Sequence, residues 1–136
     1  MENKKEIKDE KDRTEIEKKE ETIDKESTNI IGFKDFKKVE MVIAMILEAE
    51  KVENADRLLK LEVDTGEDKR TLVAGVAEYY TPEELIGRKI IIVKNLKPAK
   101  IRGVHSRGMI LAASDATGRP FIPIIPEETP VGAILK

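Results

Sequence analysis

The stretch Thr81-Pro82-Glu83-Glu84-Leu85-Ile86-Gly87 decides the fold that this sequence predicts. Thr81 can cap a helix, proline suits the first helical position, and Glu84 stands three residues after the threonine, as a capping box requires. Gly87 follows as a residue that readily ends a helix. The sequence therefore predicts one short helix here, and the elements on either side of it determine the architecture.

The segments before this helix have the pattern of three strands. Val39 to Leu47 is apolar on both faces and partly β-branched, which suits a central strand bent around a barrel. Apolar and charged residues alternate from Leu59 to Val63, as in a half-buried strand. Arg70 to Ala77 follows as the partner of that strand. Turns are predicted at residues 54–56 and 65–68, where Asn, Asp and Gly gather.

Two further strands follow the helix, at Arg88 to Val93 and at Met109 to Ala113. Three strands, a short helix and two strands are the order of elements in an OB-fold, whose helix lies between the third and fourth strands. The sequence therefore predicts an all-β, five-stranded OB-fold barrel. This barrel carries a C-terminal extension and follows a charged N-terminal tail.

The segment between the last two strands carries charge of one sign only. Two glycines and a proline indicate a shaped loop there, and no acid interrupts it. Its basic side chains, with one lysine just before it, are Lys94, Lys97, Lys100, Arg102 and Arg107. A cationic loop between two buried strands of a small barrel is typical of a surface that binds the phosphates of a nucleic acid. The plainer alternative is a solvated surface loop.

The charge of the chain is unevenly distributed. Its 136 residues carry a net charge of −2, yet residues 1–28 alone hold 8 Lys or Arg and 11 Asp or Glu. The remainder holds 17 basic and 16 acidic residues and is almost neutral. Such a domain does not bind long duplexes by bulk charge, but it can recognise a compact nucleic acid through one local patch.

The composition also excludes several kinds of chemistry. The chain has no cysteine, which excludes disulfides, thiolate metal sites and cysteine nucleophiles. His105 is the single histidine, and no phosphate-binding loop or metal-ligand spacing occurs, so we expect no enzyme activity, no metal and no cofactor. No apolar run approaches the length of a membrane span, and the N-terminus lacks the apolar core of a signal peptide. A cytoplasmic protein is therefore expected.

Residues 1–29 are predicted to form a charged tail, and residues 30–136 to form the folded domain. The tail has only Ile7, Ile16 and Ile23 as aliphatic residues, too few for a coiled-coil seam. A disordered or transiently helical tail is the favoured interpretation. A helix that docks on a partner protein is the alternative.

The segment from about residue 119 to residue 136 follows the completed barrel, is rich in apolar residues and contains four of the six prolines of the chain. It either folds back on its own barrel or forms a subunit interface, because large apolar patches seldom stay exposed. The second interpretation is favoured and predicts a homodimer.

Aromatic side chains are few. Tyr79 and Tyr80 follow the third strand, and we expect one in the core and the other exposed. A stacking role for the exposed ring stays open. Only five aromatic residues occur in the chain, so an extended base-stacking platform is not expected, which favours recognition of a folded RNA over a single strand.

Several motifs of this chain resemble those of the tRNA-binding domain family. This family includes the C-terminal domain of many methionyl-tRNA synthetases, free-standing tRNA-binding proteins and a domain of endothelial monocyte-activating polypeptide. The resemblance covers about residues 33–135. The motifs are Phe36–Val39, Glu48–Glu50, Ala55–Leu61, Pro82–Arg88, Asn95–Gly103 and Ser106–Ala113.

The resemblance implies an OB-fold that binds tRNA by shape, without catalysis, as a free protein or a partner of methionyl-tRNA synthetase or another synthetase. It also implies a homodimer formed through the C-terminal segment. Three basic residues would contact the phosphate backbone, and Ser106 and Met109 would line the RNA surface. The RNA-binding residues implied in this way are Asn95, Lys97, Lys100, Arg102, Ser106, Arg107 and Met109.

The chain departs from the family pattern at two positions. Val42 and Met45 stand where many members carry an arginine and a lysine. Either the cationic loop contributes a larger share of the binding, or this surface is buried by a partner. The loss of two charges also supports an alternative function, a chaperone-like or protein-interaction dimer built on the same barrel.

Overall fold

The computed structural model describes residues 29–136, so the expectations for the tail concern residues outside the described part, apart from Asn29. The chain divides into two compact units, Met1–Val39 and Glu40–Lys136. The first contains a five-residue helix, α2 (Phe33–Lys37), whose Lys37 ammonium lies 5.4 Å from the centroid of the Phe33 ring. The sequence did not predict this helix.

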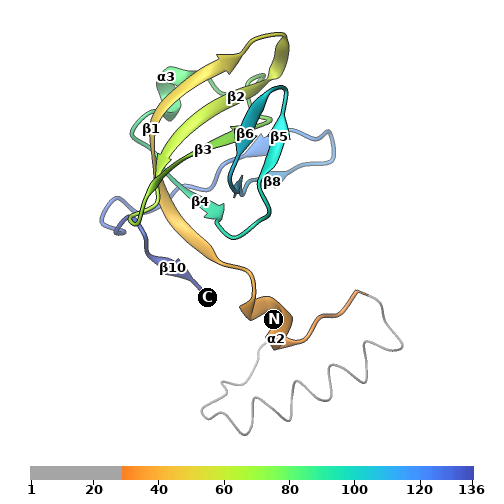
Figure 1. Cartoon of the computed structure of the whole chain (residues 1–136), viewed down its shortest axis with the longest axis vertical. Helices are drawn as coiled ribbons and strands as arrows, with labels where there is room; N and C mark the ends of the chain where they lie inside the picture. The colour runs from red at the N-terminus through yellow and green to blue at the C-terminus, as the bar shows by residue number, and fades with distance from the viewer. Residues whose placement is uncertain (1–28) are drawn as a thin grey trace, which may run out of the picture. The chain divides into compact units, whose positions relative to one another are not determined.

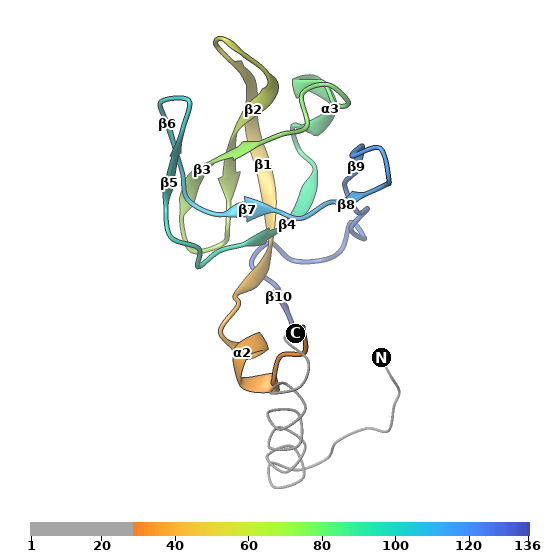
Figure 2. The same ribbon diagram turned by 90° about the vertical axis from the view of Figure 1, so that its right-hand side faces the viewer.

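The second unit is built around one antiparallel sheet (Figure 1). Five strands are hydrogen-bonded in the order β3-β2-β1-β4-β7, and β10 adds to one side of β1. Their bounds are β1 (Met41–Val52), β2 (Ala55–Asp64), β3 (Lys69–Ala74), β4 (Lys89–Val93), β7 (Met109–Ile110) and β10 (Ile134–Leu135). The sheet curls on itself, as Figure 2 shows.

Strand β1 belongs to both halves of the barrel. Its residues Met41 to Met45 pair with β4, and Met45 to Val52 pair with β2. The register shifts between Ile46 and Glu48, where an irregularity interrupts the pairing with β2. Such irregularities bend a strand and increase its twist, so β1 can turn from one partner to the other.

The short helix is α3 (Pro82–Leu85), and it confirms the predicted capping box. The Thr81 hydroxyl accepts from the Glu84 N–H, and the Glu84 carboxylate accepts from the Thr81 N–H at 2.7 Å. Leu85 is fully buried, and the N–H of Gly87 donates to the Ile46 carbonyl at 2.7 Å. The helix thus lies between β3 and β4, as an OB-fold requires.

The core consists of aliphatic side chains from alternating strand positions. Leu59, Leu61 and Val63 are fully buried, which confirms the half-buried strand predicted there. The cluster comprises Val42, Ala44, Ile46, Leu59, Leu61, Val63, Leu72, Ala74, Val76, Leu85, Ile90, Ile92 and Ile122. This core fixes the faces of β1, β2 and β4 and therefore the directions of the loops between them.

The all-β class is confirmed, but residues 29–136 contain more strands than the five predicted. The cationic segment is not a plain loop, because it includes a hairpin of β5 (Ala99–Ile101) and β6 (Val104–Ser106). The expected strand at 109–113 is interrupted after β7 and resumes as β8 (Ala113–Ser114). β8 leaves the main sheet and pairs with β9 (Pro120–Phe121), which no local pattern indicated.

Strand ends also differ from the prediction, for local reasons. β1 continues beyond Leu47 to Val52, and the turn falls at residues 53–54, where Asn54 has a φ of +62°. β3 ends at Ala74 instead of Ala77, because the carbonyl of Val76 accepts from two following amides and starts a turn.

The barrel closes between β3 and the end of β6 with the two residues that follow it. The N–H of Arg107 donates to the Thr71 carbonyl at 2.9 Å, and the N–H of Val73 donates to the Ser106 hydroxyl at 3.0 Å. The same hydroxyl donates to the carbonyl of Gly108 at 3.2 Å. Residues 106–108 therefore form a closing seam, in which a side chain replaces one backbone partner.

The C-terminal segment packs partly on its own unit. β10 pairs with β1, Ile122 is only 5% exposed, and the Lys89 ammonium donates to the carbonyls of Glu127 and Thr129. Ile124 and Ile134 nevertheless remain 87% and 70% exposed. Both alternatives raised by the sequence thus retain support, because the segment folds back and still presents apolar side chains.

Gly108 limits what the closing seam tolerates. Its φ is +135°, and a Cβ atom there would lie 2.9 Å from the Val93 carbonyl oxygen and 3.1 Å from a Leu72 methyl carbon. We expect Gly108→Ala to destabilise the fold, because it adds a backbone clash to the conformational strain. The matched control is Gly87→Ala, where φ is +87° and the space is open. The control should cost about 1–2 kcal/mol, and Gly108→Ala about 1–3 kcal/mol more, by denaturant unfolding. Equal losses would contradict the clash.

Candidate nucleic-acid interface

The β5–β6 hairpin has the tightest possible turn. Ile101 pairs with Val104, so Arg102 and Gly103 are its two central residues. Their φ angles are +49° and +83°, the positive values at both positions that a type I′ turn requires. Glycine adopts a positive φ at little cost, and this requirement of the turn explains why Gly103 stands at this point of the cationic segment.

Arginine is energetically unfavourable at position 102, because the backbone there has a positive φ. A left-handed backbone costs an ordinary L-residue about 1–2 kcal/mol, and Asn or Gly fills the first position of such turns more readily. Strained residues of this kind gather at functional sites. The positive φ at the tip of the hairpin therefore makes Arg102, whose side chain is exposed, a candidate functional residue.

Three cations of the hairpin region are exposed and unneutralised. Lys97, Lys100 and Arg102 all lie on the surface. Within residues 29–136, none of them takes part in a salt bridge. Lys100 faces His105 across the hairpin, so the strand beside it adds no acid. These three side chains form a free cationic ridge, a name we keep for Lys97, Lys100 and Arg102.

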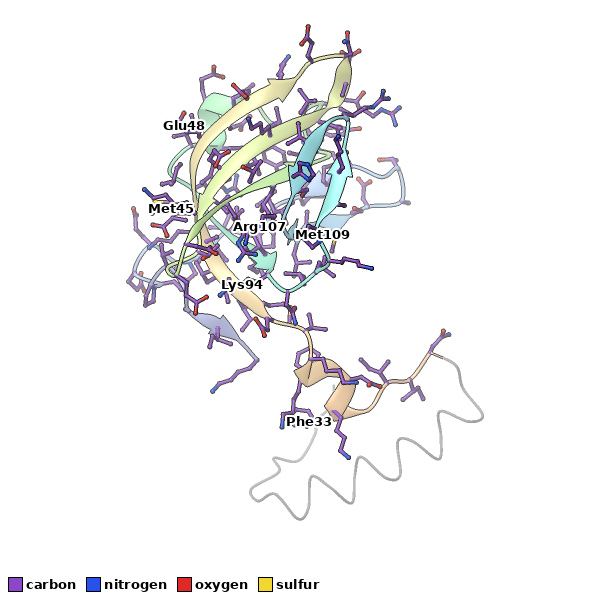
Figure 3. The ribbon with its side chains drawn as sticks, viewed as in Figure 1. Phe33, Met45, Glu48, Lys94, Arg107 and Met109 are labelled. Carbon is purple, nitrogen blue, oxygen red and sulfur yellow. The ribbon has the colours of Figure 1, made fainter. Side chains whose placement is uncertain are left out.

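The two other cations lie at the foot of the hairpin and meet acids from the β2–β3 turn. Lys94 is paired with the carboxylate of Glu67 and its side chain is 16% exposed. Arg107 lies 4.0 Å from Asp68 and is 49% exposed. Figure 3 shows Lys94, Arg107 and Met109 gathered below the hairpin. The sequence indicated no acid here, because Glu67 lies 27 residues from Lys94 along the chain and Asp68 lies still farther from Arg107.

Arg70 fastens both ends of the cationic segment. Its guanidinium donates to the Lys94 carbonyl at 3.0 Å and to the Arg107 carbonyl at 3.1 Å. Two further bonds reach the Asp68 carboxylate, at 3.2 Å and 2.9 Å, in the bidentate arrangement that favours arginine over lysine. The Arg70 side chain is 9% exposed. Arg70 is a positioning residue that the sequence did not reveal, since nothing local distinguishes it from other strand-edge cations.

The hydrogen bond from Arg70 is the largest cause that lowers the pKa of Asp68, from 3.8 to about 2. The Thr65 hydroxyl adds to the effect by donating to the same carboxylate at 2.7 Å. Asp68 therefore stays ionised through the physiological range. We call the ion pair of Arg70 and Asp68, with its two bonds to the cationic segment, the clamp.

The remaining predicted residues divide between surface and interior. Met109 is 47% exposed on β7, beside the foot of the hairpin. The Asn95 side-chain oxygen accepts from the Glu40 N–H at 2.9 Å, which joins the start of the segment to the residue before β1. Ser106 is only 4% exposed, and its hydroxyl is engaged in the closing seam. The structure thus places Ser106 behind the surface that it was expected to line.

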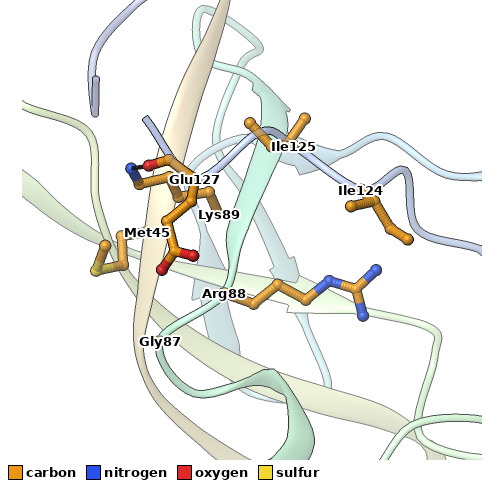
Figure 4. Close-up of a pocket in the computed structure, with 7 residues that line it drawn as sticks. All are labelled: Met45, Gly87, Arg88, Lys89, Ile124, Ile125 and Glu127. Carbon is orange, nitrogen blue, oxygen red and sulfur yellow. Dashed lines mark hydrogen bonds between the residues drawn. The ribbon is translucent and has the colours of Figure 1, made fainter. Parts of the chain in front are cut away.

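The two positions without the family's charges lie away from the ridge. Val42 is 7% exposed and belongs to the core of its own unit. Met45 lines a pocket of about 250 Å³ next to the C-terminal segment (Figure 4). The other lining residues are Gly87, Arg88, Lys89, Ile124, Ile125 and Glu127. This concavity combines apolar carbon with one acid and two cations, and both cations already donate to backbone carbonyls of the C-terminal segment.

The described part of the chain offers no cluster of three or more His, Asp or Glu side chains that could hold a metal ion. Among the helices of residues 29–136, none has the length and apolarity to cross a membrane. What the geometry provides is a protruding cationic hairpin on a rigid base, which suits phosphate recognition.

Comparison with known proteins agrees with this geometry. Residues 41–133 match the model of the family described as "Putative tRNA binding domain". The methionine–tRNA ligase of Methanococcus aeolicus is 51% identical over 110 residues, which cover 81% of this chain but 16% of that protein. The chain therefore spans about a sixth of the length of this relative.

Solved structures show the same fold. A methionyl-tRNA synthetase-related protein from Pyrococcus horikoshii matches with a TM-score of 0.73 and 43% identity, over 76% of this chain and 94% of that one. The chaperone CsaA from Bacillus anthracis matches with a TM-score of 0.71 and 27% identity, over 77% of this chain and 97% of the other.

The clamp makes stability depend on pH. Because the folded-state pKa of Asp68 lies below its unfolded value, its contribution is complete above pH 4 and is lost as the pH falls towards 2. We expect Asp68→Asn to be less stable than the parent chain at pH 7 and to show a smaller loss of stability between pH 5 and pH 2. Denaturant unfolding at a series of pH values measures both. Parallel pH profiles for the two chains would contradict a native ion pair at Asp68.

Proposed function

The chain belongs to the putative tRNA-binding domain family, and from this premise we propose that its β5–β6 hairpin binds the phosphate backbone of tRNA. The observation that carries the proposal is the free cationic ridge, with Arg102 in a strained conformation at its tip. No catalytic step is part of this function. The module holds a folded RNA and leaves any chemistry to another domain or protein.

Recognition by shape follows from the kind of contacts available. Cations that bind phosphates carry no base information, so a ridge on a rigid base reads the path of the backbone instead. Each neutralised phosphate releases counterions and adds about 0.7–0.9 to the salt slope of binding. Three ridge cations therefore make the affinity strongly dependent on salt.

The likeness to a small part of a methionine–tRNA ligase supports a role beside a synthetase. We propose that the domain works in the cytoplasm, either appended to such an enzyme or as a separate subunit. A second tRNA contact on the same assembly raises the effective concentration of tRNA near the catalytic domain. The gain comes from linkage and needs no change in the catalytic site.

Homodimer formation is the further part of the proposal. Ile124 and Ile134 are the most exposed large apolar side chains of residues 29–136, and both come from the C-terminal segment. Apolar surface of this kind is typical of interfaces between subunits. A dimer would present two ridges to one RNA.

A chaperone-like function on the same barrel is the second candidate, favoured by the structural likeness to CsaA. In that case exposed apolar residues would hold polypeptide instead of a second subunit. Pull-down with and without ribonuclease separates the two functions, because partners that persist after RNA is destroyed are held by protein contacts.

Replacing the ridge should abolish most tRNA binding. We expect Lys97→Ala with Lys100→Ala and Arg102→Asn to weaken tRNA binding by about 100-fold, at roughly 1 kcal/mol per phosphate contact, and to lower the salt slope by about 2–3. Anisotropy of labelled tRNA at several salt concentrations measures both quantities. Lys60→Gln is the control, since Glu50 already neutralises this lysine at 3.6 Å. Equal affinities for the triple variant and the control would refute the ridge as the binding site.

Arg102→Asn alone separates binding from folding. Asn-Gly is the favoured pair for a type I′ turn, so stability should stay the same or rise by about 0.5–1 kcal/mol. Affinity for tRNA should still fall about 5-fold, because one phosphate contact is lost. A variant that folds better and binds equally well would show that the strained arginine has no part in binding.

The dimer depends on apolar contacts that charge should break. We expect the parent chain to have twice the mass of one chain in light scattering, and Ile124→Glu with Ile134→Glu to reduce it to one. Both side chains are exposed in a single chain, so each chain should stay folded, and the melting temperature should fall by the stability that dimerisation adds. A monomeric parent chain, or a charged variant that remains dimeric, would contradict this interface.

A further inference from the structure

Arg119 is an exposed cation outside the β5–β6 hairpin, and its guanidinium lies over two aromatic rings. The guanidinium carbon of Arg119 lies 5.5 Å from the centroid of the Tyr79 ring and 5.1 Å from that of Phe121. The rings are 44% and 45% exposed. Tyr79 follows β3 and Phe121 belongs to β9, so the fold brings together residues that are distant in sequence.

The core of the barrel does not require these rings. The neighbouring residues Tyr80 and Ile122 turn inward, where Ile122 is 5% exposed and Tyr80 packs against the core cluster. The Tyr80 hydroxyl also accepts from the Ile122 N–H at 3.0 Å, which joins the two segments. Tyr80 and Ile122 therefore contribute to the packing of the core, whereas Tyr79 and Phe121 lie on the surface.

The loop before Arg119 is closed by one carboxylate. Asp115 accepts from the Thr117 hydroxyl at 2.7 Å, from the Thr117 N–H at 2.9 Å and from the Arg119 N–H at 3.0 Å. The Asp115 N–H in turn donates to the Arg119 carbonyl at 3.1 Å. The backbone of Arg119 is therefore fixed before any ligand arrives, which reduces the entropy lost on binding.

The chemistry of this cluster suits a nucleotide. A guanidinium stacked on rings keeps its edge N–H groups for a phosphate, and the outer faces of the rings can stack on bases. No carboxylate of residues 29–136 forms a salt bridge with Arg119. The Asp115 carboxylate is close enough for the Arg119 charge to contribute to lowering its pKa, but it forms no salt bridge with the guanidinium, whose N–H groups can therefore reach an anion.

We propose that Tyr79, Arg119 and Phe121 form a second RNA contact, which binds an unpaired nucleotide. The rings stack on its base, and the Arg119 guanidinium donates hydrogen bonds to its phosphate. This inference rests on the proposed function and extends it from backbone to base contacts. Figure 2 shows the β5–β6 and β8–β9 hairpins at opposite edges of one face, with β7 between them. A folded RNA lying across this face meets the ridge with a helical backbone and the cluster with a loop.

Fluorescence tests the stacking directly, because the chain contains no tryptophan. Phe121→Trp keeps a ring at the cluster and adds a unique signal. We expect saturating tRNA to quench the introduced indole, and a fully paired RNA duplex bound at the ridge to leave it unchanged. Unchanged emission while labelled tRNA is bound in the same sample would overturn the proposal, and so would equal quenching by the duplex.

Substitutions test the two halves of the contact. We expect Tyr79→Ala to weaken tRNA binding about 5- to 100-fold without changing the salt slope, and Tyr79→Phe to retain the affinity. Arg119→Gln should lower the affinity and reduce the salt slope by about 0.7–0.9. A melting curve of each variant shows whether it is folded, and Lys60→Gln again serves as the control.

The outcomes distinguish this inference from the function on which it rests. If the parent chain does not bind tRNA, or if the ridge variants bind as well as the parent, the proposed function fails. If the ridge variants lose binding while Tyr79→Ala and Arg119→Gln keep both affinity and salt slope, only the second contact is refuted.

Discussion

The position of the candidate interface depends on the guanidinium of Arg70. It joins the carbonyls at the two feet of the cationic segment and is held by the ionised carboxylate of Asp68. A cationic hairpin repels itself, and residues 95–106 bury little surface that could hold it in place. A nearly buried arginine with four bonds in a fixed fork supplies the rigidity that the hairpin cannot supply itself. Because the Arg70 guanidinium is bonded to groups of its own chain, it adds no unpaired positive charge to the surface.

The motif that suggested RNA binding also closes the barrel. Ser106 provides an acceptor for an amide of β3, Arg107 bonds to Thr71 through its backbone, and Gly108 allows a backbone approach that no side chain would permit. Two of these three residues therefore have a structural reason to be what they are. The cations of the ridge, by contrast, form no salt bridge within residues 29–136. This difference separates the residues that position the candidate interface from those proposed to form it.

The sequence predicted what is local or periodic. The capping box at Thr81 and Glu84, the alternation from Leu59 to Val63 and the order of elements were all readable, and they suffice for the OB-fold class. It could not predict contacts between distant segments. Glu67 neutralises Lys94, and Arg70 clamps the hairpin, only because the barrel brings β2, β3 and the cationic segment together. Ser106 was misplaced for the same reason, since its partner Val73 lies 33 residues away.

Strand β10 is only two residues long, yet with the residues before it covers an edge that would otherwise be open. Ile43 exchanges hydrogen bonds with Gly132 and Ala133, and Met41 and Val42 pair with the last residues of the strand. Met41 to Met45 is an uncharged, apolar run, the kind of edge on which sheets of other molecules grow. Residues 132–135 thus cover this edge, and a chain without them would present an unpaired apolar strand to which strands of other molecules can pair.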